Sequence, residues 1–407
     1  MQKIVIIGAG QAGAAMAAKL RALGHDGPLT LVGEEPLLPY QRPPLSKKYL
    51  LGELSIERLF LRQSGFYTDQ GIEVRTSARA TGIDPRARRI VLSDGPALDY
   101  DMAAICTGGR PKRLPEALGG TLEGVHVVRN VADVDSLAPR FVAGARALII
   151  GGGYIGLEAA AVAAQRGLSV TLIEAAPRIL ARVAAPETAS AIRALHEANG
   201  VVIREGVSLA RLTGANGRVV GAELADGSRI EADFAIIGIG IQPNQELAET
   251  AGLAVADGIS VDARGRTSDP AIWAAGDCTR LPLGGAEIRL ESVQNAIDQA
   301  EAVAADMLGH GKDYAPVPWF WSDQYDLKLQ IAGLGTGADR IVVRATPDAT
   351  PWHGRSHWYF SGDRLLAVDA LGDPRAFMVG KRLLETGRGL DPDIAGDAGA
   401  DLRAAMA

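Results

Sequence analysis

The stretch "KIVIIGAGQAGAAMAAKL" (residues 3–20) decides the fold. Its apolar, β-branched run at 4–7 breaks into the spacing Gly8-x-Gly10-x-x-Gly13, and the Ala-rich residues that follow predict a helix ending near Gly24. A second β-branched run, "LTLVGEE" (29–35), predicts another strand with Glu34 at its end. This order of strand, glycine turn, helix, strand and acidic residue predicts a dinucleotide-binding unit.

Each glycine of this motif has a separate physical role. Gly8 makes a tight turn, Gly10 lets a pyrophosphate approach the backbone, and Gly13 allows the helix to pack closely on the strand. The helix N-terminus then offers free N–H groups and a partial positive charge to the phosphates. Glu34 is expected to accept hydrogen bonds from the hydroxyls of a ribose.

A second copy of the same unit begins at "ALIIGGGYIGLEAAA" (147–161). It carries Gly151-x-Gly153-x-x-Gly156, a helix, and the strand "LSVTLIE" (168–174) ending on Glu174. A single motif of this kind could be an ordinary strand–turn–helix with packing glycines, but two complete units favour the binding of two dinucleotides. A nicotinamide that donates electrons and a flavin that accepts them form a pair that can carry out a redox reaction.

The composition and net charge of the chain argue against several classes of function. The 407 residues suggest two or three domains, and 47% apolar with 22% charged residues is ordinary for a globular protein. A net charge of -6 argues against a dedicated nucleic-acid binder, which needs an excess of Lys and Arg. No apolar run reaches the roughly 18 residues of a membrane span, so we expect no membrane association. The first strand starts almost at Met1 without a basic segment or cleavage site, so we expect no export signal.

Cysteines and histidines indicate neither a thiol relay nor a metal site. Cys106 and Cys278 lie far apart without a Cys-x-x-Cys pattern, which fits a reducing cytoplasm. We expect Cys106 to be a small buried residue. His353 and His357 ("HGRSH") have suggestive spacing, but Gly354 and the following "WYF" favour a strand over the helix that such a site needs. We therefore expect no metal.

Several further segments support the flavin half and carry a resemblance to a known superfamily. Three strand-and-turn stretches are informative: "CTGGRP" (106–111), "GIGIQPN" (238–244) and "TSDPAIWAAGD" (267–277). Together with the two glycine motifs, they resemble the glutathione-reductase-like flavoproteins that bind two dinucleotides. The resemblance covers essentially the whole chain. It implies that Asp277 contacts the ribityl chain or pyrophosphate of FAD.

The segment "PYQRPPLSKKYL" (39–50) points to one branch of this superfamily. It resembles the FAD-dependent NADH:ferredoxin reductases of oxygenase electron-transfer chains, the putidaredoxin-reductase type. Disulfide reductases carry a cysteine pair in this region and NADH peroxidases a single cysteine, whereas this segment has none. "RLESVQNAIDQA" (289–300) and "VPWFWSDQYDLKLQIAG" (317–333) also match that branch.

The resemblance places Lys47 beside the flavin ring, and we expect it to pair with Glu158. A buried acid after the second glycine motif would be costly without a cationic partner. The alternative is that Lys47 is an ordinary solvated lysine.

Other contacts follow from the same resemblance. Tyr154 is expected to shield the flavin until nicotinamide displaces it, and Trp321 to line the flavin site and electron exit; both could instead be packing aromatics. The helix beginning near Ser292 is expected to direct its positive end at the flavin pyrimidine, unless it is only an amphipathic surface helix. The remaining implied flavin contacts are Ala12, Arg42, Ala80, Thr107, Gly108, Arg129 and Val293.

These patterns predict an α/β fold with two Rossmann-like dinucleotide-binding domains and a small α+β C-terminal domain. The FAD-binding domain is expected at 1–110 and 238–313, the NAD-binding domain at 111–237, and the C-terminal interface domain at 314–407.

The leading functional hypothesis is an NADH:ferredoxin oxidoreductase. NADH would give a hydride to FAD, and the reduced flavin would pass electrons singly to a [2Fe–2S] ferredoxin that feeds a haem or Rieske oxygenase. One alternative is the same fold with rubredoxin, oxygen or a quinone as acceptor. Another is a flavin-bound signalling protein of the apoptosis-inducing-factor kind. Such a protein needs a basic surface, which a pI near 5.6 does not favour. We expect a monomer by default.

Overall fold

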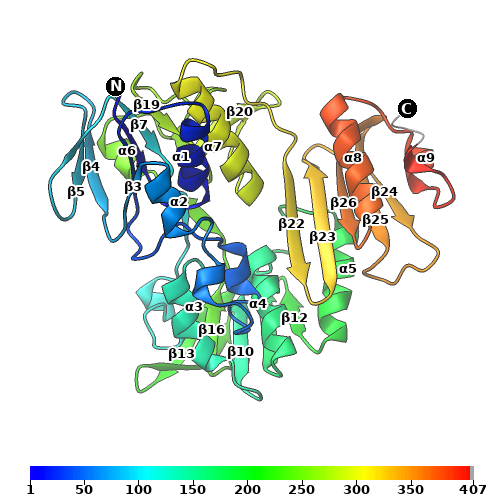
Figure 1. The fold of residues 1–407 in the computed structure, drawn as a ribbon. Coiled ribbons are helices and arrows are strands. Elements are labelled where there is room, and N and C mark those ends of the chain that lie inside the picture. Colours follow the sequence, from blue (N-terminus) through cyan, green and yellow to red (C-terminus); the bar gives the residue numbers. More distant parts are fainter. Residues whose placement is uncertain (404–407) are drawn as a thin grey trace. The chain divides into compact units, whose positions relative to one another are not determined.

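The computed structural model describes residues 1–403, and the chain divides into two compact units. Unit 1 comprises 1–42, 55–110 and 241–316, and unit 2 comprises 43–54, 111–240 and the described residues from 317 on. Each unit is therefore built from segments far apart in the sequence, as the colours of Figure 1 show. The three-domain division expected from the sequence stays a prediction, and the last four residues of its 314–407 domain lie outside the described residues.

Unit 1 is built on a five-stranded parallel sheet, as the first glycine motif predicts. The strand order is β19-β7-β1-β2-β3. The five strands are β1 (Ile4–Ile7), β2 (Leu29–Val32), β3 (Ile72–Arg75), β7 (Met102–Ile105) and β19 (Ile272–Ala274). The central strand β1 is fully buried, which explains its unbroken run of β-branched residues.

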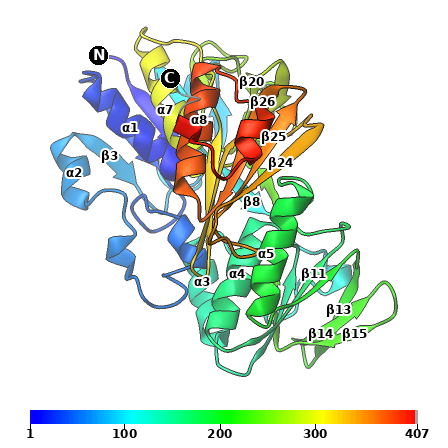
Figure 2. The ribbon, with the colours of Figure 1, turned by 90° about the vertical axis from the view of Figure 1, so that its right-hand side faces the viewer.

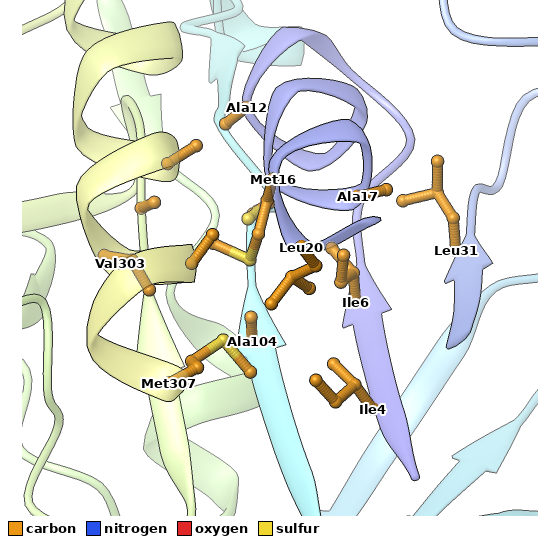
Figure 3. Packing of buried hydrophobic residues seen from close by; sticks show 14 of the residues in the cluster. Ile4, Ile6, Ala12, Met16, Ala17, Leu20, Leu31, Ala104, Val303 and Met307 are labelled. Carbon is orange, nitrogen blue, oxygen red and sulfur yellow. The ribbon is translucent and has the colours of Figure 1, made fainter. Parts of the chain in front are cut away.

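Two helices, α1 (Gln11–Ala22) and α7 (Val293–Met307), cover one face of this sheet. Figure 3 shows Met16 and Leu20 of α1 between Met307 of α7 and Ile6 of β1. Val5 and Ile7 belong to a second core on the opposite face, because successive strand residues point to opposite sides.

Short elements complete unit 1. Two three-stranded sheets have the orders β4-β5-β6 and β18-β20-β21, and β8 pairs with β17. The bounds are α2 (Ser64–Asp69), α6 (Glu246–Thr250), η2 (Ile56–Arg58), β4 (Ala80–Asp84), β5 (Arg89–Leu92), β6 (Leu98–Asp99), β8 (Gly109–Pro111), β17 (Ile241–Pro243), β18 (Ile259–Ser260), β20 (Thr279–Leu283) and β21 (Ala286–Ile288).

Unit 2 repeats the strand–turn–helix–strand arrangement. Its five-stranded parallel sheet has the order β12-β11-β10-β16-β9. Figure 2 shows the separate sheet β13-β14-β15 beside it. The bounds are η1 (Pro43–Ser46), η3 (Glu116–Leu118), β9 (Val125–His126), α3 (Val131–Leu137), η4 (Ala138–Arg140), β10 (Arg146–Ile150), α4 (Tyr154–Gln165), β11 (Ser169–Glu174), α5 (Pro186–Ala198), β12 (Val202–Glu205), β13 (Leu209–Ala215), β14 (Arg218–Leu224), β15 (Arg229–Glu231) and β16 (Phe234–Ile237).

The C-terminal part of unit 2 is an antiparallel sheet of order β22-β23-β26-β25-β24. Helix α8 packs on it, begins at the cap Asp373, and ends at Gly387 with φ +64°. The bounds are β22 (Trp319–Gln324), β23 (Leu327–Gly333), β24 (Arg340–Ala345), β25 (Arg355–Ser361), β26 (Arg364–Leu371), α8 (Pro374–Thr386) and α9 (Pro392–Gly396). Among residues 1–403, no helix has the length and apolar character needed to cross a membrane.

A buried polar cluster joins α5 to this C-terminal sheet. Thr188 of α5 donates its hydroxyl to Asp369 Oδ2 at 2.6 Å, and its oxygen lies 2.7 Å from Nδ1 of His357. Tyr359 also donates to Asp369, and its hydroxyl accepts from the Ala185 backbone N–H at 2.7 Å. The Asp369 carboxylate is fully buried, and the hydrogen bonds from these donors offset the free-energy cost of burying it.

This cluster makes a testable contribution to stability. Burial raises the pKa of Asp369 to about 6, although the hydroxyls of Thr188 and Tyr359 oppose the shift. A carboxyl group with a raised folded-state pKa stabilises the fold fully below about pH 3.9 and loses that contribution as pH rises through the folded value. The natural chain should therefore lose stability from pH 5 to pH 8, whereas Asp369→Asn should not. The free energy of unfolding of the variant, relative to that of the natural chain, should increase from pH 5 to pH 8.

Urea unfolding at both pH values measures this difference. Asp363→Asn, in the exposed turn between β25 and β26, is the matched control and should show no such gain. An Asp369→Asn effect of equal size at pH 5 and pH 8 would show that the carboxyl group does not titrate in this range.

Candidate active site

The first glycine turn, between β1 and α1, forms an open cradle in unit 1. Gly8 has φ +114°, and a Cβ at Gly8 would collide with the carbonyl of Cys106. A Cβ at Gly13 would likewise collide with the Gly8 carbonyl, whereas no described atom lies within 4 Å of a Cβ placed on Gly10. Gly10 is the N-cap of α1 and has no side chain to cover the helix N–H groups. The space and the donors fit a pyrophosphate.

Two acidic residues follow β2, and they face different partners. Glu34 is solvent-exposed, with Arg79 Nε 3.9 Å from its Oε2, so it can accept from a ribose. Glu35 instead accepts from Arg42 at 2.6 Å and from the Tyr40 hydroxyl. Burial alone would lower the pKa of Arg42, but the ionised partners around it raise that pKa above its usual value. One of these charges is Asp277, so two predicted flavin contacts from distant segments converge here.

The turn after β19 brings Asp277 to the beginning of α1. A Cβ on Gly276 would stand 3.1 Å from Ala12 Cβ, and the Gly276 N–H donates to Gln299 Oε1 of α7 at 2.8 Å. Ser292 is the N-cap of α7, whose first helical residue is Val293. The N-termini of α1 and α7 and the Asp277 turn thus belong to the same edge of the unit 1 sheet, where strand ends meet helix starts.

The turn after β7 is held by a reciprocal hydrogen-bond pair. Thr107 Oγ1 donates to the Asn244 carbonyl at 2.7 Å, and Asn244 Nδ2 donates to the Thr107 carbonyl at 2.8 Å. Gly108 follows with φ +63°. The Thr107 hydroxyl therefore fixes the shape of this turn, and the flavin contacts expected of Thr107 and Gly108 stay predictions.

The second glycine turn, between β10 and α4, reproduces the first. Gly151 has φ +108°, and a Cβ there would collide with the Gly238 carbonyl, while a Cβ on Gly156 would collide with the Gly151 carbonyl. Gly153 is the N-cap of α4, and a Cβ on it would come no closer than 4.0 Å to a described atom. This second cradle also fits a pyrophosphate.

Glu174 ends β11 directly beside this second turn. Its Oε2 accepts from the Gly152 N–H at 2.6 Å, and its Oε1 accepts from the Ala176 N–H at 2.7 Å. The carboxylate is therefore fixed at the point where the ribose of a bound dinucleotide is expected.

Lys47 and Glu158 form a buried ion pair within unit 2. Lys47 Nζ lies 3.0 Å from Glu158 Oε1, and the side chains are only 17% and 4% exposed. Ser46 donates to Glu158 Oε2 and Ser322 donates to Oε1, both at 2.7 Å. Glu158 lies on α4, which is buried along most of its length, so these three donors offset the cost of burying its charge.

Aromatic side chains of β22 gather beside the start of α4. The Tyr154 ring lies 4.6 Å from the Phe320 ring, and the Trp321 ring lies 5.7 Å from that of Trp319. Burial raises the pKa of Tyr154 well above its usual value, and its hydroxyl has no hydrogen-bond partner among residues 1–403. A buried phenol without a partner is costly, which marks Tyr154 as a position where a ligand would supply one.

Two other predicted flavin contacts lie in separate segments. Ala80 begins β4 in unit 1, whereas Arg129 precedes α3 in unit 2, where its backbone N–H donates to Asp133 at 3.1 Å. Their flavin contacts stay predictions.

Both cysteines are buried and free within the described chain. Cys106 belongs to the core beneath α1, and Cys278 to the core on the opposite face of the sheet. Burial raises the pKa of both thiols, and a charge on Cys278 would add to the shift at Cys106. Thiols held protonated in this way are unreactive.

The strand predicted around His357 is present. His357 lies inside β25, whereas His353 precedes that strand and Gly354. Residues 1–403 contain no group of three metal-ligating side chains.

Several residues of these clusters were not predicted from the sequence. They are Glu35 and Tyr40 around Arg42, and Ser46, Ser322, Gln324 and His196 around Glu158. One signal was available: in "WFWSDQ", Ser322 and Gln324 are two residues apart, so in a strand they share a face. Polar residues repeated on one face of a buried strand call for buried partners.

The chain is similar to known proteins along its whole length. Residues 2–300 match the family described as pyridine nucleotide-disulphide oxidoreductase, and residues 319–406 match the family described as reductase C-terminal. Rhodocoxin reductase of Rhodococcus erythropolis is 42% identical over 406 residues, covering 99% of this chain and 94% of that protein.

Two further comparisons concern one other reductase. Putidaredoxin reductase of Pseudomonas putida is 40% identical over 413 residues, covering 99% of this chain and 96% of that protein. The crystal structure of the covalent putidaredoxin reductase–putidaredoxin complex matches with a TM-score of 0.95 and 39% identity, covering 100% of this chain and 98% of that one.

Proposed function

The chain belongs to the pyridine nucleotide-disulphide oxidoreductase family, and we propose that it is an NADH-dependent ferredoxin reductase. Electrons pass from NADH through FAD to a [2Fe–2S] ferredoxin, which supplies a haem monooxygenase or a Rieske oxygenase. When bound, FAD accepts two electrons together as a hydride and releases them one at a time, which matches a one-electron acceptor.

The two open glycine cradles are the observation that carries this proposal. Each places an uncapped helix N-terminus at the end of a parallel strand, one in unit 1 and one in unit 2. In unit 1 the cradle lies with Arg42 and Asp277, which suits FAD. In unit 2 it is bordered by Glu174, which suits the ribose of NADH.

Segment 39–50, which carries Lys47, has no cysteine, and Lys47 forms a buried ion pair with Glu158. We assign Lys47 the role of stabilising the negative charge that reduction places on the flavin, and Glu158 the role of holding Lys47 in place. Tyr154, whose hydroxyl has no hydrogen-bond partner in the described part of the chain, is assigned to shield the flavin before nicotinamide binds, and Trp321 to line the electron exit.

Other residues are assigned to holding the dinucleotides. For FAD they are Gly8, Gly10, Ala12, Gly13, Glu34, Arg42, Ala80, Thr107, Gly108, Arg129, Asp277 and Val293, and for NADH they are Gly151, Gly153, Gly156 and Glu174. We place the protein in the cytoplasm, because both cysteines are free and buried, which suits a reducing compartment. A monomer is the default state that we assign to it.

Ferredoxin-dependent reduction of cytochrome c by NADH tests the acceptor. With FAD-loaded protein, the rate should rise steeply and saturably with added [2Fe–2S] ferredoxin, and should stay near background without it. A rate that is independent of every [2Fe–2S] ferredoxin would contradict the proposal. Rubredoxin, oxygen and a quinone serve as parallel acceptors, and a higher kcat/KM with any of them would reassign the physiological partner.

A further inference from the structure

A chain of buried hydrogen bonds extends from the Lys47–Glu158 pair to the end of α5. Ser322 donates to Glu158 at 2.7 Å, and Gln324 Nε2 donates to Ser322 Oγ at 3.1 Å. Gln324 Oε1 in turn lies 2.8 Å from Nε2 of His196. Ser322, Gln324 and His196 are each at most 1% exposed, so water does not compete for these bonds.

Gln324, with Nε2 on Ser322 and Oε1 facing His196, sets the direction of the bonds in this chain. An amide oxygen only accepts, so His196 must carry its proton on Nε2 and donate it to Gln324. Burial lowers the pKa of His196 to about 4, although the hydrogen bond to Gln324 opposes the shift, so the ring is neutral near pH 7. Nδ1 is then an acceptor, and the Tyr325 hydroxyl lies 3.3 Å from it. All donors point toward Glu158.

Tyr325 lies at the far end of this chain of hydrogen bonds. Tyr325 sits in the turn between β22 and β23 with φ +55°, a left-handed value that is unfavourable for a residue with a bulky side chain. Its ring packs edge-on against His196 at 5.2 Å. The two-residue hairpin turn between Gln324 and Leu327 requires this left-handed conformation, so the turn itself accounts for it.

We propose that Gln324 and His196 are positioning residues for the Lys47–Glu158 pair. They hold the Ser322 hydroxyl in the orientation that donates to Glu158 Oε1, the same oxygen that receives Lys47. With Ser46 on Oε2, the carboxylate is fixed as an acceptor on both oxygens, and Lys47 is fixed with it. The amide of Gln324 does not readily relay protons, so the chain orients charge instead of conducting it. This inference rests on the role proposed above for Lys47.

Variants at Gln324 and His196 separate polarity from packing. Gln324→Glu keeps the shape but replaces the donor with an acceptor, so Ser322 should turn away from Glu158. His196→Leu removes the donor, whereas His196→Gln keeps an N–H at a similar position. Anaerobic stopped-flow reduction of the bound flavin by NADH measures the effect. Gln324→Glu and His196→Leu should lower the limiting rate about tenfold, with half-saturating NADH changed less than twofold. His196→Gln should recover most of the loss.

A second readout does not depend on activity. Histidine side-chain ¹H–¹⁵N spectra of the protein should show His196 as the neutral Nε2–H tautomer from pH 5 to pH 8. Equilibrium unfolding of a double-mutant cycle should also show that Gln324→Glu costs less stability once Glu158→Gln is present, because the two side chains are coupled through Ser322. An Nδ1–H tautomer, or additive effects in the cycle, would overturn the proposal.

The matched control is His357, which is as deeply buried as His196 and lies in the same unit but bonds to Thr188 instead of this chain. His357→Leu should reduce stability yet leave the limiting rate within twofold. Equal slowing by His357→Leu and His196→Leu would assign the effect to general loosening and would also overturn the proposal. Because these measurements use no ferredoxin, a wrong assignment of the acceptor would leave their outcome unchanged.

Discussion

Lys47→Met is expected to slow the reduction of bound flavin by NADH by about 100-fold or more. The expected size follows from the effect of removing one preorganised charge or donor at a developing negative charge, about 2.7–4 kcal/mol. Lys47 meets the conditions for such an effect, because it is mostly buried and its ammonium is held 3.0 Å from Glu158 Oε1. Anaerobic stopped-flow measurement at saturating NADH gives the limiting rate directly.

Lys48 supplies the matched control. It is the next residue along the chain, carries the same charge and is exposed to solvent, so Lys48→Met should leave the limiting rate within twofold. If Lys47→Met and Lys48→Met behave alike, Lys47 is a solvated lysine with no role in the reaction.

The second large effect concerns the nicotinamide cofactor. We expect NADH to be preferred over NADPH by at least tenfold in kcat/KM, which is about 1.4 kcal/mol or more. The fixed carboxylate of Glu174 can accept from a ribose 2′-hydroxyl but repels a 2′-phosphate. Arg178, a cation close to Glu174 in the sequence, donates to the Ala184 carbonyl at 2.7 Å, so it is already engaged.

Glu174→Arg should erode this preference, and Glu174→Gln should show an intermediate ratio because it keeps acceptor capacity but loses the charge. Initial rates with both cofactors, using ferricyanide as acceptor, give the ratios. Equal use of NADH and NADPH by the natural chain would contradict the assignment. An unchanged ratio in Glu174→Arg would show that another residue selects the cofactor.

The parts of this molecule that follow local rules could be predicted from the sequence. Both glycine turns, their flanking strands and the helix starting at Val293 are set by short-range patterns, and the structure contains each of them. In the C-terminal part, short strands were predicted within 327–334, 339–345 and 356–371, where β23 to β26 lie, whereas the segment of β22 was predicted only as a domain boundary.

Other parts depend on side chains that meet only in the folded chain. Ser322 and His196 reach Glu158 from β22 and α5, and no spacing rule connects residues so far apart. Glu35, not its neighbour Glu34, holds Arg42, because the chain turns after β2 and directs the two carboxylates to different partners. The sequence pattern predicted β2 but not β22 or α5, and it predicted none of these contacts.

An anaerobic titration of the FAD-loaded protein with NADH tests the central claim most directly, that electrons pass through flavin without a thiol relay. Cys106 and Cys278 are buried, free and held protonated, so FAD should be the only redox centre. The flavin band should bleach with about one two-electron equivalent per FAD, with a long-wavelength charge-transfer band from bound NAD⁺ and no thiolate–flavin band. Consumption of a second equivalent before bleaching is complete, or loss of ferredoxin reduction after alkylation of the two cysteines, would contradict the account.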